Sequence, residues 1–280
     1  MIKTQIGFWG DRYQILDPIG RGGMARIYQG RDLLMDRVVA MKVLREVYMT
    51  DPSYLAYFQR EAKITLSLRH PNIVQALDYV QNDGNYFLVM ELIEGADLGR
   101  YLRSRGVLPV DRVTRIAHDV ALGLGAAHRR NIVHRGVKPQ EIMIGRDGSI
   151  KIIDFSLASD LSQDRHTEDV IPTEMAIGMV SYCAPEQARN EIVSPAADVY
   201  ALGVVMYMML TGRAPFDGET PVEVTRQHMQ DAPPPPSQFN PHIPRDLENI
   251  ILRCLEKEPE KRYHDGNALA HALKEFNDTI

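Results

Sequence analysis

The spacing of hydrophobic residues divides this chain into a β-rich first part and a helical second part. Between residues 12 and 45, short apolar runs are separated by glycines and polar residues, a pattern typical of strands joined by tight turns. Helical spacing follows over residues 52–69, and two strand-like runs lie around Ile73–Tyr79 and Tyr86–Leu92. Residues 93–97 are expected to be a connector, and beyond them the pattern predicts helices.

The helical part contains one long amphipathic helix and one helix that is apolar on all sides. The apolar positions of the amphipathic helix are Val113, Ile116, Ala117, Val120, Leu124 and Ala127. The segment from Asp198 to Leu210 is apolar all round, which is typical of a core helix. Asp198 is therefore expected to cap this helix or to accept hydrogen bonds from backbone amides. Further helices are expected near 221–230, 246–256 and 266–276.

Composition and charge exclude several classes of protein. The 280 residues are 44% hydrophobic and 25% charged, which is ordinary for one large globular domain or two lobes. A net charge of -5 without a basic block gives no reason to expect a nucleic-acid partner. Cys183 and Cys254 form no CxxC pair, so we expect reduced thiols rather than a disulfide framework or a zinc site.

No segment predicts contact with a membrane. The longest apolar run, Ala201–Leu210, is far shorter than the ~20 residues that cross a bilayer. The first residues lack the apolar core and cleavage site of a secretory signal. We therefore expect a cytoplasmic location, either of a separate protein or of the cytoplasmic part of a longer membrane-anchored one.

A glycine-rich turn and a lysine lie close together in the β-rich part. Gly20, Gly22 and Gly23 separate two strands, and glycines there let the backbone approach phosphates with bare N–H groups. A hairpin without a ligand explains these glycines about equally well. Glu61 lies beside the apolar stripe of the 52–69 helix, where an inward carboxylate needs a cation, and Lys42 is the expected partner. The alternative is a solvated surface glutamate.

The stretch Ile132–Phe155 combines a polar loop, a pair of strands and an aspartate. The loop is His134-Arg135-Gly136-Val137-Lys138-Pro139-Gln140-Glu141, and Asp154-Phe155-Ser156 follows the strands. A long irregular segment then extends to Ala184-Pro185-Glu186, and such loops are usually functional. Arg262 is a candidate buried partner for Glu186.

Six segments together resemble the eukaryotic-like Ser/Thr protein kinases of bacteria. They are IGRGGMARIY, VVAMKVL, IVHRGVKPQEIMI, KIIDFSLA, YCAPEQA and DVYALGVVMYMMLTGRAPF, in family order. The resemblance runs from about Asp11 to Phe276. It implies a bilobal α+β kinase-like domain at 11–277 after an N-terminal extension at 1–10. A small antiparallel β lobe with one helix would occupy about 11–92, and a larger helical lobe 93–277.

The resemblance also implies an ATP site with Mg²⁺ in the cleft between the lobes. Lys42 would hold the α- and β-phosphates, Glu61 would orient Lys42, and Asp154 would bind the metal. Met90 would line the adenine pocket, although simple core packing explains it equally well. The full set of implied nucleotide-binding residues is Ile19, Gly20, Gly22, Ile27, Ala40, Lys42, Glu61, Met90, Glu91, Ile93, Asp97, Met143 and Asp154. His134 and Phe155 would pack the loop against the core. Lys138 resembles the loop lysine of Ser/Thr-specific kinases, as opposed to tyrosine-specific ones.

Four residues depart from the family pattern, and all four concern phosphoryl transfer. Gly136 stands where the catalytic-base Asp is expected, and a positioned base is typically worth about 10²–10⁴-fold in rate. Glu141 replaces the metal-binding Asn; its oxygens can meet a hard cation, but it cannot donate hydrogen bonds as an amide does. Ser156 replaces a glycine, and Met179 replaces a Thr that bonds the catalytic Asp and Lys.

Three functions are compatible with these observations. The leading hypothesis is a pseudokinase that binds ATP and acts as a scaffold or allosteric module with signalling proteins, such as an active kinase, or as a homodimer. The alternative is a slow Ser/Thr kinase, since phosphoryl transfer depends mainly on positioning and electrostatics. A structural module without nucleotide is the third, and Lys42 and Asp154 argue against it. Thr167 and Thr173 are candidate phosphate acceptors that would pair with Arg135, or plain loop residues.

Overall fold

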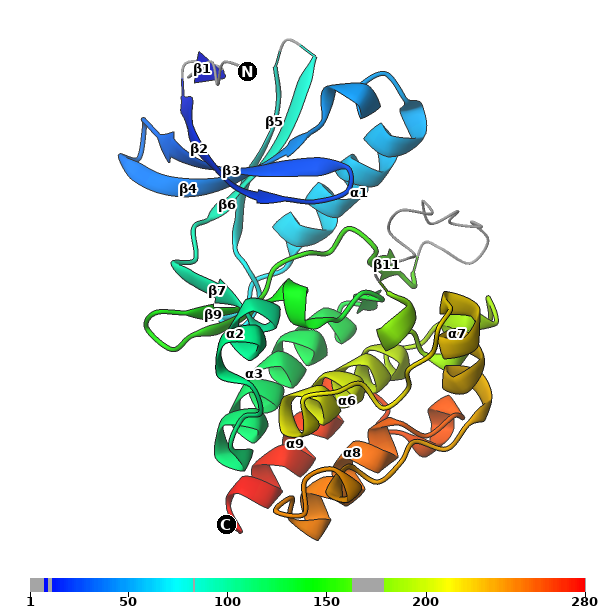
Figure 1. Cartoon of the computed structure of the whole chain (residues 1–280). Helices are drawn as coiled ribbons and strands as arrows, with labels where there is room; N and C mark the ends of the chain where they lie inside the picture. Colours follow the sequence, from blue (N-terminus) through cyan, green and yellow to red (C-terminus); the bar gives the residue numbers. More distant parts are fainter. Residues whose placement is uncertain (1–7, 10–11, 83, 163–178, 280) are drawn as a thin grey trace. The chain divides into compact units, whose positions relative to one another are not determined.

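The structure, a computed structural model, describes residues 8–9, 12–82, 84–162 and 179–279. They form two compact units. The first comprises the residues up to Arg69 together with Val74–Glu94, and the second comprises His70–Ile73 and the chain from Gly95 onward. An antiparallel sheet with one α-helix makes up the first unit, and the second is mainly helical (Figure 1). The predicted α+β class, with a small β part and a larger helical part, is confirmed.

The sheet of the first unit has the strand order β1-β2-β3-β4-β6-β5. Its strands are β1 Phe8–Trp9, β2 Tyr13–Arg21, β3 Ala25–Asp32, β4 Arg37–Leu44, β5 Ala76–Asn82 and β6 Asn85–Glu91. Alternate residues of these strands form the core, namely Tyr13, Ile15, Val39, Met41, Val43, Phe87 and Val89. One feature was not predicted. Strand β1 pairs with β2, so the sheet begins within residues 1–10, which were expected to be an N-terminal extension.

The helix α1, Pro52–Ser67, begins where the sequence signals it, after a short 3-10 turn η1 at Glu46–Tyr48. The Asp51 carboxylate accepts a hydrogen bond from the Ser53 N–H at 2.8 Å, and a proline starts the first turn. Its buried residues are Phe58, Glu61, Ala62, Ile64 and Thr65. The sequence predicts an apolar stripe of Leu55, Phe58, Ala62 and Leu66. That prediction is partly wrong, because Leu55 and Leu66 are only half-buried.

The second unit contains two small sheets. Strands β7 Gly95–Asp97, β9 Ile142–Gly145 and β10 Ile150–Ile152 form one, and β8 Ile132–Val133 pairs with β11 Ser159–Asp160. The expected connector at 93–97 thus ends in a strand. A Cβ on Gly95 would lie 2.0 Å from the Ile144 carbonyl oxygen, so only glycine fits there. The strand expected from Ile73 begins later, at Ala76, because Ile73 instead bridges to Ile152.

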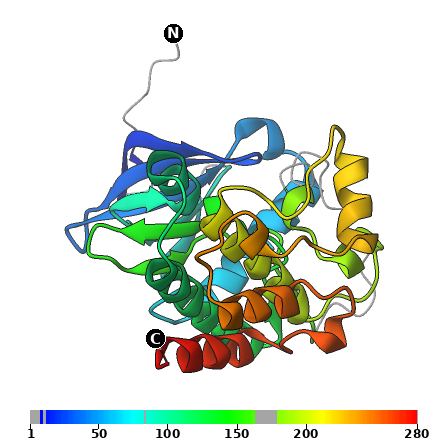
Figure 2. The ribbon, with the colours of Figure 1, turned by 60° about the horizontal axis from the view of Figure 1, so that its bottom comes forward.

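The helices of the second unit are α2 Leu98–Arg105, α3 Val110–His128, α5 Pro185–Ala188, α6 Ala196–Thr211, α7 Pro221–Gln230, α8 Arg245–Cys254 and α9 Gly266–Asn277. All residues but two of the apolar helix α6 are buried, and α3, α8 and α9 pack against it. Short 3-10 turns are η2 Pro139–Glu141, η3 Val180–Tyr182, η4 Pro236–Gln238 and η5 Pro259–Lys261. Helix α9 packs along α3 (Figure 2), where a Cβ on Gly266 would lie 2.4 Å from the Ala121 carbonyl oxygen. Within the described ranges, no helix combines the length and apolarity that a bilayer crossing requires.

Candidate functional site

The first unit contains the predicted ion pair between Lys42 and Glu61. Lys42 lies on β4 and Glu61 on α1, and the Nζ and Oε1 atoms are 2.5 Å apart. The two side chains are only 8% and 2% exposed. Because each buried charge needs its partner, the pair ties the helix to the sheet and confirms the expectation from sequence.

The glycine-rich turn between β2 and β3 is held by hydrogen bonds at its tip. The Gly22 N–H donates to the Ala25 carbonyl at 2.9 Å, and Gly20 lies opposite Ile27 in the ladder. The Arg45 guanidinium donates to the Gly23 carbonyl at 2.9 Å, and the Arg45 backbone N–H donates to the Met24 carbonyl at 3.0 Å. Sequence reasoning missed Arg45, since nothing near it in the chain indicates a contact with the turn.

The remaining residues predicted to bind nucleotide in the first unit lie on neighbouring strands or after them. Ala40 on β4 and Met90 on β6 are direct partners in the ladder, and both are buried. The Glu91 carboxylate accepts a hydrogen bond from the Gln75 N–H at 2.8 Å. Ile19 is 42% exposed, whereas Ile93 is half-buried. The strands therefore place Ala40 and Met90 side by side, an arrangement compatible with both adenine binding and core packing.

In the second unit, Asp198 braces the loop that begins at His134. Its carboxylate accepts hydrogen bonds from the N–H groups of His134 and Arg135 and from the His128 Nε2, each at 2.8 Å. Burial alone would raise the pKa of Asp198, but the hydrogen bonds from His128 and the His134 amide outweigh it and lower that pKa. The predicted bracing of backbone amides is confirmed.

The same network extends to the last helix through His128, which sequence reasoning missed. The His128 Nδ1 accepts a hydrogen bond from the Gly266 N–H at 3.1 Å, so its Nε2 carries the proton that it donates to Asp198. The start of α9 and the loop at His134 are thus joined through one imidazole. The signal in the sequence was slight: a histidine at the end of an otherwise apolar helical face.

His134 and Phe155 pack against each other, as predicted. Their ring centroids are 4.7 Å apart at an interplanar angle of 63°, and both residues are buried. Burial lowers the pKa of His134, so the ring is neutral at pH 7. Its Nδ1 accepts a hydrogen bond from the Gly136 N–H at 3.2 Å. The loop is therefore held in one shape by groups on both of its sides.

Gly136 and Met179 line one small pocket. They are two of the four residues that depart from the kinase family pattern. The lining residues of the pocket are Arg135, Gly136, Val137, Lys138, Met179, Tyr182 and Ala201. Burial raises the pKa of Tyr182 to about 12, so its phenol stays protonated at neutral pH. None of these seven residues carries a carboxylate or an imidazole, the two groups that most often act as a base at neutral pH. The His134 Nδ1, which lies outside this lining, would be 3.7 Å from a Cβ on Gly136.

Lys138 and Glu141 form an ion pair that the sequence analysis did not anticipate. The Lys138 Nζ lies 3.3 Å from the Glu141 Oε1, three residues further along. The Asp154 carboxylate accepts a hydrogen bond from the Ser156 N–H at 2.9 Å. No group of three or more potential metal ligands occurs among the residues that the structure describes. The Asp154 carboxylate is suited to be one ligand of a Mg²⁺ ion that phosphate oxygens also bind, whereas the Glu141 carboxylate is paired with the Lys138 ammonium.

Asp97 and Met143, both predicted to bind nucleotide, are direct partners in the β7–β9 ladder. The Asp97 carboxylate caps helix α2 by accepting a hydrogen bond from the Arg100 N–H at 2.8 Å. This role was missed, although an aspartate directly before a helix is its usual signal. Thr167 and Thr173 lie outside the described residues.

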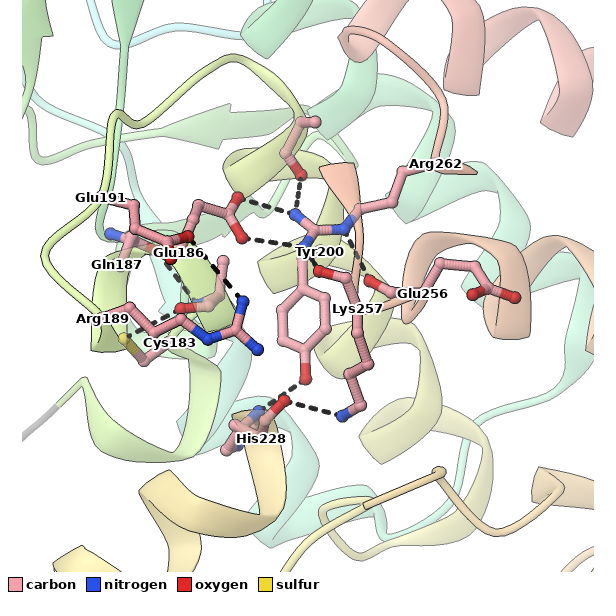
Figure 3. Close-up of polar contacts among 12 residues, drawn as sticks. Cys183, Glu186, Gln187, Arg189, Glu191, Tyr200, His228, Glu256, Lys257 and Arg262 are labelled. Atoms are coloured by element: carbon pink, nitrogen blue, oxygen red, sulfur yellow. Dashed lines mark hydrogen bonds and ion pairs between the residues drawn. The ribbon is translucent and has the colours of Figure 1, made fainter. Parts of the chain in front are cut away.

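A buried network anchors the segment around Glu186 (Figure 3). Arg262 donates to both Glu186 carboxylate oxygens at 2.8 Å, and the two side chains are 0% and 2% exposed, as predicted from sequence. Lys257 donates to the His228 carbonyl at 2.7 Å, and the His228 Nδ1 lies 2.8 Å from the Tyr200 hydroxyl. Burial lowers the pKa of Lys257 to about 8 and that of His228 to about 4. The sequence carried no signal for this second cluster.

Comparisons with known proteins agree with this arrangement. The family described as "Protein kinase domain" matches residues 13–273. Serine/threonine-protein kinase PrkC of Bacillus subtilis is 40% identical over 263 residues, which cover 94% of this chain and 40% of PrkC. Serine/threonine-protein kinase PknB of Mycobacterium leprae is 38% identical over 257 residues, covering 90% of this chain and 41% of PknB. This chain thus spans about two fifths of the length of these relatives.

The similarity extends to three-dimensional structure. The crystal structure of the Mycobacterium tuberculosis PknI kinase domain aligns with a TM-score of 0.75 at 27% identity. The alignment covers 96% of this chain and 98% of that one. The two relatives named above are bacterial Ser/Thr kinases, and this chain belongs to the protein kinase domain family.

Proposed function

We propose that this chain is a pseudokinase: a kinase-fold module that binds ATP and has lost efficient phosphoryl transfer. The observation that carries the proposal is the pocket at Gly136, where the seven lining residues that the structure describes include no carboxylate or imidazole. A kinase needs a group there that accepts or orients the proton of the substrate hydroxyl. Without it, chemistry slows by roughly 10²–10⁴-fold.

Nucleotide binding is supported by residues that keep the family pattern in both units. The buried Lys42–Glu61 pair supplies an oriented ammonium for the α- and β-phosphates. In the second unit Asp154 supplies a carboxylate for Mg²⁺. We propose that Mg²⁺ contributes less than in active kinases, because Glu141 pairs with Lys138.

The test is intact-mass spectrometry after incubation with ATP and either Mg²⁺ or Mn²⁺, together with calorimetric titration of ATP. We expect ATP to bind and no phosphate to be added. K42A should bind ATP more weakly, and K63A, which removes an exposed lysine from helix α1, should bind like the wild type. Phosphate added to the wild type at ordinary kinase rates, and not to K42A, would exclude a pseudokinase.

A second candidate is a slow Ser/Thr kinase, and one observation favours it. The supports around the loop are intact, since Asp198 holds the His134 and Arg135 amides and Arg262 holds Glu186. Slow phosphate incorporation that disappears in K42A and in D154N would favour this function. Protein partners in a signalling pathway, a homodimer, a cytoplasmic location and phosphate acceptance by Thr167 or Thr173 are proposed on the family resemblance alone.

A further inference from the structure

The tip of the glycine-rich turn between β2 and β3 has little packing of its own. Gly22 and Gly23 are exposed, and a Cβ on Gly23 would meet no atom of the described residues within 4 Å. The next residue, Met24, is only 3% exposed and anchors the turn in the unit. The position of the tip therefore depends on hydrogen bonds, of which Arg45 supplies the two described above, to Gly23 and to Met24.

The Arg45 side chain also contacts two stacked aromatic rings. Its guanidinium carbon lies 5.4 Å from the centroid of the Tyr48 ring, in the 3-10 turn η1. The Tyr48 ring stacks on the Tyr54 ring, with centroids 4.2 Å apart and an interplanar angle of 25°. A planar guanidinium is attracted by the face of such a ring. Arg45, Tyr48 and Tyr54, here called the Arg45 stack, thus reach from the glycine-rich turn to the first turn of helix α1.

The Arg45 stack contacts helix α1 on the side that carries Glu61. Tyr54 and Glu61 share this side because seven residues make about two helical turns. Glu61 pairs with Lys42 on β4, and Arg45 directly follows that strand. Two links therefore join the end of β4 to α1, the buried ion pair and the Arg45 stack. The Arg45 stack is the link that also holds the glycine-rich turn.

We propose that Arg45 is a positioning residue for the phosphates of the nucleotide, an inference that rests on the proposed binding of ATP. Its hydrogen bond to the Gly23 carbonyl holds the turn whose backbone N–H groups would meet the phosphates. The rings of Tyr48 and Tyr54 hold the guanidinium and fix it relative to helix α1. A turn that is already held loses less conformational entropy when phosphates bind, so the stack increases the affinity for ATP.

The test compares R45A, Y48A and Y48F with the wild type by calorimetric titration of ATP and of adenosine. We expect ATP to bind about five- to tenfold more weakly to R45A and about threefold more weakly to Y48A, because a hydrogen bond and a cation–π contact are lost in the first and only the latter in the second. Y48F keeps the ring and should bind ATP like the wild type. Adenosine has no phosphates and should bind equally to all four proteins.

R31A, which removes an exposed arginine from β3, is the control for loss of a positive charge from the same sheet. It should bind ATP like the wild type. Unchanged ATP affinity in R45A would overturn the proposal. Weaker binding in R45A with unchanged binding in Y48A would also overturn it, because the guanidinium would then act on the phosphates directly and not through the turn.

Hydrogen exchange without nucleotide gives a second readout. The amides of residues 20–25 should exchange about tenfold faster in R45A and about threefold faster in Y48A, because the turn opens more often. The Tm should fall by no more than about 2 °C, since both side chains are only half-buried. Unchanged exchange in R45A would overturn the role of the Arg45 stack alone, whereas a wild type that binds no ATP would overturn the proposed function.

Discussion

The Lys42–Glu61 pair of the first unit and the Lys138–Glu141 pair of the second differ in burial and in origin. Lys42 and Glu61 are separated by 19 residues in the sequence, lie 2.5 Å apart and are almost fully buried. Lys138 and Glu141 are three residues apart, lie 3.3 Å from each other and are 22% and 17% exposed. The first pair follows the family pattern, whereas the second exists only because a glutamate replaces the expected asparagine.

The two pairs differ in how strongly a substitution is expected to affect stability. Breaking a buried pair leaves an uncompensated charge and costs about 3–5 kcal/mol, whereas a solvent-accessible pair is worth roughly 0–1 kcal/mol. Substitution at Glu61 is therefore heavily penalised, while position 141 can change at little cost to stability. The proposed loss of function concerns the loop alone, because the buried pairs Lys42–Glu61 and Glu186–Arg262 are both present.

The largest expected effect concerns a third ion pair, Glu186–Arg262, which is buried like Lys42–Glu61 but lies in the second unit with Lys138 and Glu141. E186A should lower the free energy of unfolding by about 3–5 kcal/mol, because Arg262 would remain buried without its carboxylate. Urea unfolding measures the loss. K261A, which removes the exposed Lys261–Glu258 pair, should leave stability unchanged. Equal stability of the two variants would mean that the second unit tolerates loss of its buried pair.

The next effect concerns the retained pair of the first unit. K42A should weaken ATP binding by about 30- to 100-fold, or roughly 2–3 kcal/mol, because the ammonium that meets the phosphates is lost. Isothermal titration calorimetry measures the affinity, with K63A on helix α1 as the control for loss of a lysine charge from the same unit. Unchanged affinity in K42A would break the comparison, since the buried pair would then serve stability alone.

Mild acid should destabilise the second unit through a buried imidazole. The pKa of His228 is lowered by burial, and then by the Lys257 charge, to about 4, whereas it is about 6.5 in the unfolded chain. The unfolded state therefore binds more protons below pH 6.5, and stability falls as the pH is lowered towards 4.

At pH 5 the loss from His228 should be about 2 kcal/mol, from a difference of roughly 1.5 pH units. H228N, whose amide oxygen can replace the Nδ1 that meets the Tyr200 hydroxyl, should show a shallower decline between pH 7 and 5 in urea unfolding. Parallel pH curves for the two proteins would exclude His228 as the source.

The smallest effect is expected at the Lys138–Glu141 pair. E141N should change the free energy of unfolding by less than about 1 kcal/mol, because the pair with Lys138 is partly exposed. The ratio of the ATP affinity in Mg²⁺ to that in EDTA should also rise roughly threefold, because an amide oxygen becomes free to bind the metal. Titrations with Mg²⁺ and with EDTA compare the two proteins. E141Q, which keeps the length of the side chain, separates the effect of charge from that of size.

Much of the fold and part of the site could be predicted from residue order. The helices at 221–230 and 266–276, the pairing of Lys42 with Glu61 and of Glu186 with Arg262, and the bracing by Asp198 followed from periodicity and motifs. The Lys138–Glu141 pair was within reach, since the two residues are i,i+3 neighbours. It was missed because position 141 was considered only for its role at the metal, without its nearest cation.

By itself, the sequence determined most of the elements and the kinase-like order of the motifs, because periodicity and turn chemistry act over short range. Only the tertiary structure decided what surrounds each position. It brought Met179 to the pocket at Gly136, Gly266 to His128 and Lys257 to the end of α7. These residues are separated by 29 to 138 positions, and such contacts depend on how whole elements pack.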